Sequence, residues 1–166
     1  VLALNAGKHV ISAVPAAMTL EDCQLLIDTV KKTGLTYMMA ETSYYVQEVI
    51  SARKFFQEGA FGDLFCCEAE YHHDGLDVLF FEDGKPTWRH GLPPMNYPTH
   101  STAMLIGVTG ERLTEVACIG WKDKDPIYEK NPYNNPFWSE TALFKTDRDH
   151  ACRIAVYWKV AAGGTE

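Results

Sequence analysis

The chain has 166 residues, of which 46% are hydrophobic and 22% charged, and its formal net charge is −7. This composition is typical of a globular protein rather than a disordered one. The acidic balance, without any run of Lys and Arg, argues against nucleic acid as a partner. No apolar stretch approaches the roughly 18 residues that a membrane span requires. Five cysteines without Cys-x-x-Cys spacing favour a reducing compartment, such as the cytoplasm.

Residues 8–40 predict a strand, a helix and a second strand. The first strand covers 8–12, and Thr19 then suits a helix N-cap because Asp22 follows three residues later. Apolar residues recur at helical spacing from Cys23 onward, and Gly34 ends the helix. A second apolar strand covers 35–40. Two such strands joined by a crossover helix predict a parallel sheet.

From about residue 42 the pattern changes to helices and alternating strands. Helices are predicted at 45–58 and 99–109, and strands at 65–73, 113–121, 137–146 and 151–160. Helix 45–58 would turn Val46, Val49, Ile50 and Phe56 inward. The segment 147–149 reads as a hairpin turn between the last two strands. We therefore expect an α/β chain whose second part packs helices on a mostly antiparallel open sheet.

The irregular segment 74–98 and the helix after it carry the polar candidates for a site. Loops this long are usually functional or disordered. Trp88 and Arg89 either clamp an anion beside a flat ring or anchor the loop to the core. Thr99 is the expected N-cap of the next helix, so His100 lies in the first turn, where the helix dipole favours a neutral imidazole that suits a base. A purely structural histidine is the alternative.

Other familiar sites find no support in the sequence. His72 and His73 are neighbours on a strand and point to opposite faces, so we expect no metal site there. Neither GxGxxG nor GxxxxGK[ST] occurs, so a dinucleotide, if bound, needs a phosphate loop upstream of Val1. The chain starts at Val1 without Met and stops soon after a strand, which suggests a fragment of a longer protein.

A set of short motifs, in order, resembles the glucose-fructose oxidoreductase and inositol dehydrogenase family. The set comprises Ala6-Gly7-Lys8-His9-Val10 with Pro15, the helix after Thr19, Gly59-Ala60-Phe61-Gly62, Trp88-Arg89 and His100. The resemblance implies that residues 1–42 are the end of an NAD(P)-binding Rossmann domain and that 43–166 are an incomplete substrate-binding and oligomerisation domain. It also implies that the antiparallel sheet joins subunits into a homo-oligomer.

A subgroup, the NAD-dependent α-N-acetylgalactosaminidases, is similar in further motifs. These are Val14-Pro15-Ala16-Ala17-Met18-Thr19, Met38-Met39-Ala40-Glu41, Tyr71 with His73-Asp74, and Tyr97-Pro98-Thr99-His100. Ala13 and Val14 replace the Glu-Lys pair common in the family, and Asn96 and Ala103 stand where two aspartates are common. The glutamate of the subgroup's Glu-Val-Pro-Ala pattern falls on Ala13.

The resemblance implies an NAD- or NADP-dependent oxidoreductase acting on a sugar or polyol. The implied residues are His100 and Tyr45 as catalytic groups, Ala13, Val14, Pro15, Trp88 and Arg89 near the cofactor, and His73, Asp74 and Tyr97 at the sugar. Two alternatives stay open. The first is a glycoside hydrolase that oxidises its substrate transiently, and the second is an inactive binding protein of the same fold.

Overall fold

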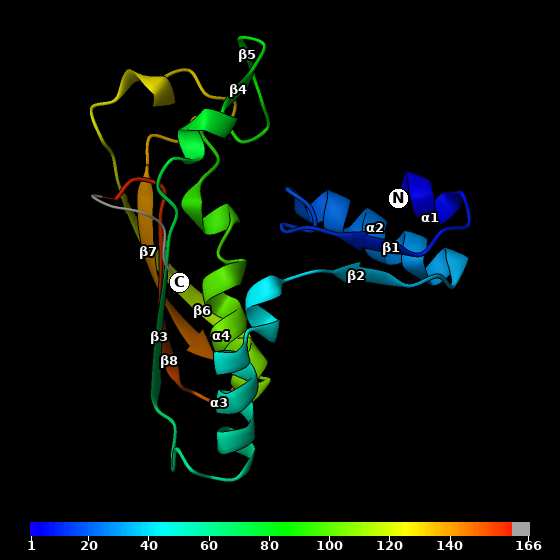
Figure 1. Cartoon of the computed structure of the whole chain (residues 1–166), viewed down its shortest axis with the longest axis vertical. Helices are drawn as coiled ribbons and strands as arrows, with labels where there is room; N and C mark the ends of the chain where they lie inside the picture. The colour runs from blue at the N-terminus through cyan, green and yellow to red at the C-terminus, as the bar shows by residue number, and fades with distance from the viewer. Residues whose placement is uncertain (161–166) are drawn as a thin grey trace. The chain divides into compact units, whose positions relative to one another are not determined.

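The computed structural model describes residues 1–160 and divides into two compact units, Val1–Thr42 and Ser43–Glu166 (Figure 1). Residues 161–166 of the expected second domain lie outside the described part of the chain. The assignment of the first unit to nucleotide binding and of the second to substrate binding and oligomerisation stays a prediction. The two units are described separately below.

The first unit contains the predicted strand, helix and strand. Its elements are α1 (Leu2–Asn5), β1 (Val10–Ser12), α2 (Leu20–Thr33) and β2 (Tyr37–Met39). The strands β1 and β2 pair in parallel, with Ile11 beside Met38. Thr19 caps α2, because its hydroxyl accepts a hydrogen bond of 3.1 Å from the Asp22 amide. Gly34 ends α2 in the left-handed conformation, at φ 66°. The parallel unit expected from the sequence is confirmed.

The apolar face of α2 lines an open groove in this unit. The groove has a volume of about 410 Å³, and its walls include Cys23, Leu26, Val30 and Tyr37.

 

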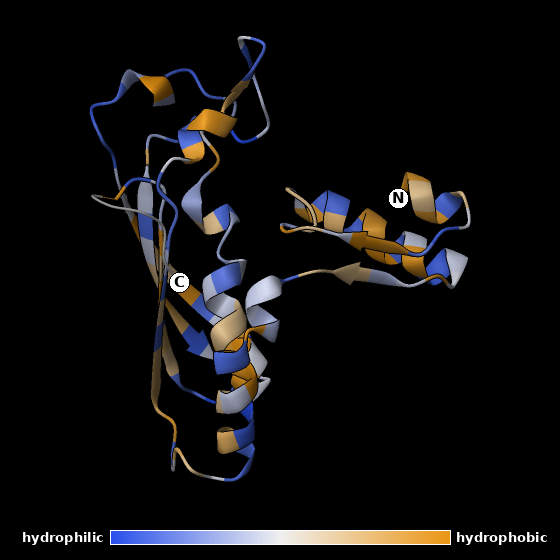
Figure 2. Ribbon diagram, viewed as in Figure 1, coloured by the Kyte–Doolittle hydropathy of each residue, from blue (hydrophilic) through white to orange (hydrophobic). Residues whose placement is uncertain are grey.

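Ile27, on the same helix face, is 47% exposed, and Figure 2 shows hydrophobic segments on β1 and along α2. The apolar stripe that the sequence predicts is therefore present, and within this unit much of it stays uncovered.

The second unit consists of two longer helices, a four-stranded sheet and several short elements. The helices are α3 (Gln47–Gln57) and α4 (Thr99–Thr109), and the strands of the sheet are β3 (Cys66–His72), β6 (Leu113–Trp121), β7 (Ser139–Thr146) and β8 (Ala151–Tyr157). The short elements are η1 (Thr42–Tyr45), which begins at the boundary, η2 (Leu76–Leu79), β4 (Phe81–Glu82), β5 (Lys85–Pro86), η3 (Pro94–Asn96) and η4 (Pro126–Tyr128).

The strand order of this sheet is β3-β8-β7-β6. The pairs β6–β7 and β7–β8 are antiparallel and β3–β8 is parallel, so the sheet is mostly antiparallel, as expected. The turn between β7 and β8 includes Asp149 at φ 67°, a backbone conformation in which Asp is enriched. The predicted fold class, with a parallel unit followed by helices on a mostly antiparallel sheet, is confirmed.

The helices α3 and α4 lie together on one side of the sheet (Figure 1), where α4 contacts β3 and β8. Gly107 of α4 permits this close packing, because a Cβ atom there would lie 3.0 Å from a methyl carbon of Val49 on α3. Val49 is buried, whereas Ile50 is 42% exposed. The prediction that Ile50 points inward is wrong, since α3 packs against α4 over a narrower arc than the apolar pattern suggested.

The segment 74–98 is more regular than the sequence predicts. It forms η2, the β4–β5 hairpin and η3, and it buries Phe80 and Leu92 almost completely. The indole nitrogen of Trp158 donates a hydrogen bond of 3.0 Å to the Leu92 carbonyl. Composition predicted turns here, and the apolar side chains between them attach the segment to the core.

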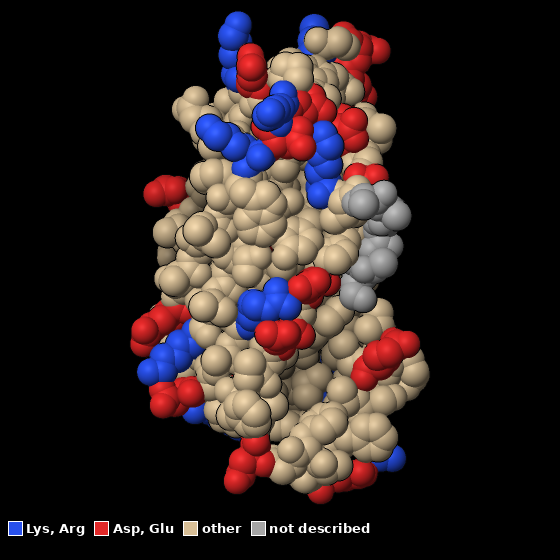
Figure 3. Space-filling view, turned by 90° about the vertical axis from the view of Figure 1, so that its left-hand side faces the viewer, with Lys and Arg blue, Asp and Glu red and all other residues tan. Residues whose placement is uncertain are grey.

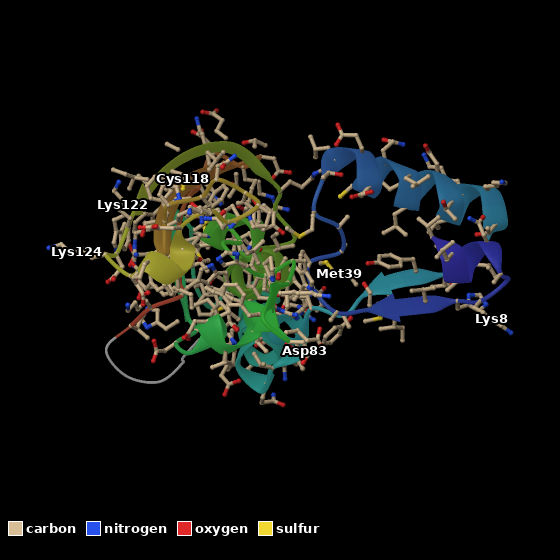
Figure 4. All side chains as sticks on the ribbon, turned by 90° about the horizontal axis from the view of Figure 1, so that it is seen from above. Lys8, Met39, Asp83, Cys118, Lys122 and Lys124 are labelled. Atoms are coloured by element: carbon tan, nitrogen blue, oxygen red, sulfur yellow. The ribbon has the colours of Figure 1, made fainter. Side chains whose placement is uncertain are left out.

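The face of the sheet away from the helices carries exposed apolar side chains. Register places Ile119, Trp121 and Leu143 on this face, and they are 71%, 47% and 59% exposed. In Figure 3 this side of the sheet shows a broad area without Lys, Arg, Asp or Glu. Charges follow at the end of β6, where Lys122 and Lys124 extend from the chain (Figure 4). Within residues 1–160, no helix is long and apolar enough to cross a membrane.

Candidate active site

His100 lies in the first turn of α4, which spans the predicted residues 99–109, but the N-cap residue differs from the prediction. Pro98, not Thr99, occupies the N-cap position, and its carbonyl accepts the Thr102 amide at 2.9 Å. The expectation that Thr99 caps the helix is therefore wrong. Pro98 adopts helical angles, φ −88° and ψ 0°, so that its own carbonyl can already accept the first helical hydrogen bond.

Aromatic side chains surround the His100 imidazole. The Tyr71 ring lies 4.7 Å from it and the Tyr97 ring 5.4 Å, both measured between ring centroids. The imidazole is 9% exposed, and its Nδ1 atom lies 3.3 Å from the hydroxyl oxygen of Ser43. This contact fixes the orientation of the ring, and packing against two tyrosines restricts its access to water.

A small cavity next to this cluster brings three predicted site residues together. It has a volume of about 140 Å³, and its lining residues are His73, Leu76, Leu79, Arg89, Leu92, Tyr97 and Trp158. Tyr97 belongs both to the cavity and to the aromatic contacts of His100. Apolar walls with a few convergent polar groups are characteristic of small-molecule sites. The cavity therefore joins residues from β3, the segment 74–98 and the chain after β8 in one candidate site.

Of the pair Trp88 and Arg89, only Arg89 lines the cavity. The guanidinium carbon of Arg89 lies 4.2 Å from the Trp88 ring centroid, in a cation–π contact. Arg89 lines the cavity, whereas Trp88 is 42% exposed and its carbonyl accepts a 2.6 Å hydrogen bond from the Tyr133 hydroxyl. Trp88 thus supports Arg89, and Arg89 is the member of the pair that faces the cavity.

Other predicted residues lie apart from the cavity lining. Tyr45 is 56% exposed, and its ring contacts Tyr44 at 5.0 Å. Asp74 accepts a 3.4 Å hydrogen bond from the Val160 amide. The structure supplies partners for Asp74 in the backbone, and the roles of Tyr45 and Asp74 stay predictions.

His72 and His73 point to opposite faces of β3, as their neighbours show. The His72 ring lies 4.9 Å from the Tyr157 ring, measured between centroids, and its Nε2 atom lies 3.0 Å from a carboxylate oxygen of Glu70. The His73 ring instead lies 5.6 Å from the Tyr71 ring. Among residues 1–160, no group of three or more His, Cys, Asp and Glu side chains could hold a metal ion.

The residues expected near a nicotinamide follow β1 in the first unit. Ala13, Val14 and Pro15 lie beyond the carboxyl end of this parallel strand, where open parallel sheets bind ligands. Val14 is buried and the Val14–Pro15 bond is cis. Small apolar residues suit the edge of a flat ring, and the sequence of this unit offers no glycine-rich loop for phosphates. These residues therefore fit the nicotinamide end of a dinucleotide only.

Sequence reasoning missed three participants in the site. Ser43 and Trp158 were not proposed, and Tyr71 was recognised only as part of a motif. The alternation of the strand at 65–73, which puts Tyr71 and His73 on one face, carried a usable signal for Tyr71. Ser43 and Trp158 lie far from His100 in sequence, so only the folded chain reveals their contacts.

Comparison with known proteins gives sequence relatives of one kind. Glycosyl hydrolase family 109 protein 2 of Bacteroides fragilis is 39% identical over 85 residues, which are 51% of this chain and 20% of that protein. An alpha-N-acetylgalactosaminidase of Bacteroides fragilis is 38% identical over 85 residues, with the same 51% and 20% coverage. The chain thus matches about a fifth of the length of these relatives. No family model matches the chain.

Solved structures with the same fold include a scyllo-inositol dehydrogenase. Apo scyllo-inositol dehydrogenase from Lactobacillus casei superposes with a TM-score of 0.76 at 18% identity, over 98% of this chain and 46% of that one. The same enzyme with NAD(H) and scyllo-inositol gives 0.75 at 17% identity, over 98% and 47%. The chain thus shares the fold of scyllo-inositol dehydrogenase and is similar in sequence to family 109 glycosyl hydrolases, in agreement with the expected resemblance.

Proposed function

We propose that the protein containing this chain oxidises a hydroxyl group of a sugar-like substrate with NAD or NADP, and that His100 is the base. The observation that carries this proposal is the position of His100, oriented by Ser43 and packed against Tyr97, which also lines the cavity. A sugar ring would contact Tyr97 and Trp158, while His73 and Arg89 supply hydrogen-bonding groups for its hydroxyls.

Removal of hydride from a carbinol carbon requires a group that takes the hydroxyl proton, and His100 would take it. The cofactor, when bound, supplies the hydride acceptor. Tyr45 is the proposed helper of His100, and Ala13, Val14 and Pro15 would border the nicotinamide. The lysine common at the position of Val14 is absent, which leaves the imidazole as the base. Trp88 contributes by holding Arg89.

The fate of the hydride distinguishes two reactions. Similarity to an alpha-N-acetylgalactosaminidase favours transient oxidation, in which the hydride returns to the substrate after the glycosidic bond has broken. Similarity in fold to scyllo-inositol dehydrogenase makes net oxidation the second candidate. Ala13 stands where the glycosidase subgroup has glutamate, so the transient route here would proceed without that carboxylate.

Product analysis of the protein that contains this chain separates these reactions. With NAD and aryl glycosides or polyols, transient oxidation releases the aglycone without accumulating NADH, whereas net oxidation gives NADH in proportion to product. His100→Ala should lower turnover about 10²–10⁴-fold and leave cofactor affinity nearly unchanged. The control His9→Ala, exposed at the start of β1, should retain turnover. Unchanged turnover in His100→Ala would refute the proposed role of His100, whereas absence of any turnover in the natural protein would favour an inactive binding protein.

The outer face of the sheet is the proposed surface for self-association. Its exposed apolar residues Ile119, Trp121 and Leu143 form the kind of patch that marks protein interfaces. A second copy of the chain presenting the same face would cover them, in a symmetric homo-oligomer. Cytoplasmic location and the absence of nucleic-acid and membrane partners stay predictions from composition.

A further inference from the structure

Two cysteines far apart in sequence are neighbours inside the second unit. Cys67 on β3 and Cys152 on β8 are register partners in the parallel pair. Neighbouring strands lie about 4.7–4.9 Å apart, and register partners point to the same face of a sheet. A disulfide typically joins Cα atoms about 4.4–6.8 Å apart with Cβ atoms directed alike, and this pair meets both conditions.

Access to this pair is one-sided. Cys152 is completely buried, whereas Cys67 is partly exposed and lines an apolar cavity of about 180 Å³. The cavity lies between the helices and the start of β3, and its walls include Phe56, Leu64 and Met104. An attacking reagent with an apolar tail would thus meet Cys67 first, and Cys152 would react only through Cys67.

The electrostatic surroundings favour the same order. Contact with the Cys152 thiol lowers the pKa of Cys67, although burial and the Glu111 carboxylate oppose this shift. The same contact and burial raise the pKa of Cys152. Because a thiolate is the reactive form, Cys67 is the nucleophile of the pair and Cys152 its neighbour in the thiol form.

We propose that Cys67 is a site of oxidation by organic hydroperoxides and that Cys152 resolves it to an intramolecular disulfide. In the first step the Cys67 thiolate attacks the terminal oxygen of the hydroperoxide, the O–O bond breaks, and an alcohol leaves after taking up a proton. This gives a sulfenic acid on Cys67. In the second step the Cys152 sulfur displaces the hydroxyl, so that an S–S bond forms and water leaves. The hydroperoxide is reduced and the two thiols are oxidised.

The chain offers a matched control for this proposal. Cys66 precedes Cys67 on β3 but points to the opposite face and is more exposed, and Cys118 is exposed on the edge strand β6. If exposure alone governs thiol reactivity, Cys66 and Cys118 are oxidised before Cys67. If the contact with Cys152 and the apolar cavity govern it, Cys67 is oxidised first.

The test treats the folded chain with cumene hydroperoxide and follows thiols and peptides by mass spectrometry. In a Cys66→Ser/Cys118→Ser background, we expect the loss of two thiols per chain. The tryptic peptide that contains Cys67 should be cross-linked to the tryptic peptide 149–153. The cross-linked pair should weigh two hydrogens less than the sum of the two peptides, and dithiothreitol should separate it. In Cys152→Ser, and independently in Cys152→Ala, dimedone should capture a sulfenic acid on Cys67. Urea denaturation verifies that each variant is folded.

Two results would overturn the proposal. One is oxidation of Cys66 or Cys118 before Cys67 in the unsubstituted chain. The other is the absence of the 67–152 cross-link in the folded double variant after complete consumption of Cys67 thiol. Because the readout is thiol chemistry and not turnover, it is independent of the proposed activity.

Discussion

The Nδ1 atom of His100 lies 3.3 Å from the hydroxyl oxygen of Ser43, a residue 57 positions earlier in the chain. The contact connects η1, which precedes α3, with the first turn of α4. It orients the imidazole toward its aromatic neighbours, so Ser43 acts through His100 as a positioning residue.

Ser43→Ala should therefore lower turnover by about fivefold, since a lost hydrogen bond of about 1 kcal/mol translates into roughly that factor. Turnover and its pH profile are both measured, because loss of the Ser43 contact should also shift the pH dependence. Ser51→Ala, on α3, is the control and should retain both. An unchanged rate and pH profile in Ser43→Ala would remove Ser43 from the site.

The Trp158 side chain lines the cavity and is also buried in the core, so its removal should destabilise the second unit. It is 1% exposed, and its indole donates to the Leu92 carbonyl. Trp158→Ala should lower the free energy of unfolding by about 3–5 kcal/mol. Trp88→Ala, at an exposed position, should change it by only about 0.5 kcal/mol. Urea denaturation measures both, and equal losses would contradict this prediction.

Glu140 should make stability depend on pH. Burial raises the pKa of Glu140, although its carboxylate accepts a hydrogen bond of 2.6 Å from the Met95 amide. The folded chain then binds this proton more tightly than the unfolded chain, so the stabilisation is complete below the unfolded pKa of about 4.3 and is lost as the pH rises through the folded value.

Glu140→Gln keeps an oxygen for the Met95 amide and cannot titrate. We expect the stability of the natural chain relative to this variant to fall as the pH rises through that window. Urea denaturation of both chains at a series of pH values gives the difference. A difference that is constant, or that grows with pH, would show that burial of Glu140 does not control this dependence.

Substitution on the outer face of the sheet should weaken self-association. Ile119→Lys places a charge in the proposed interface and should convert an oligomer into monomers in sedimentation experiments, with little effect on folding because Ile119 is 71% exposed. Val78→Lys, at a 74% exposed position in η2, is the control and should leave the oligomer intact. If the natural protein sediments as a monomer at micromolar concentration, the proposed interface is wrong.

Local sequence determined most of the secondary structure. Spacing of apolar residues gave the helix at 20–33 and the alternating strands, and the terminal residues Thr19, Gly34 and Gly110 marked helix ends by their own chemistry. The N-cap of α4 was misplaced by one residue, because Thr99 has a good capping side chain but Pro98 already has helical angles. The motif set, taken in order, pointed to the kinds of protein that the comparisons found similar.

Tertiary structure alone decided which residues meet. Strand alternation predicts that Tyr71 and His73 share a face, yet it does not reveal that Tyr97, Arg89 and Trp158 close a cavity beside them. Nor does any local pattern pair Cys67 with Cys152, because the order of strands in a sheet depends on chain connections and packing. Contacts within a helix turn or a strand depend on residues that are close in the sequence. A site is assembled from distant segments, and burial of the apolar surface that these segments share selects their arrangement.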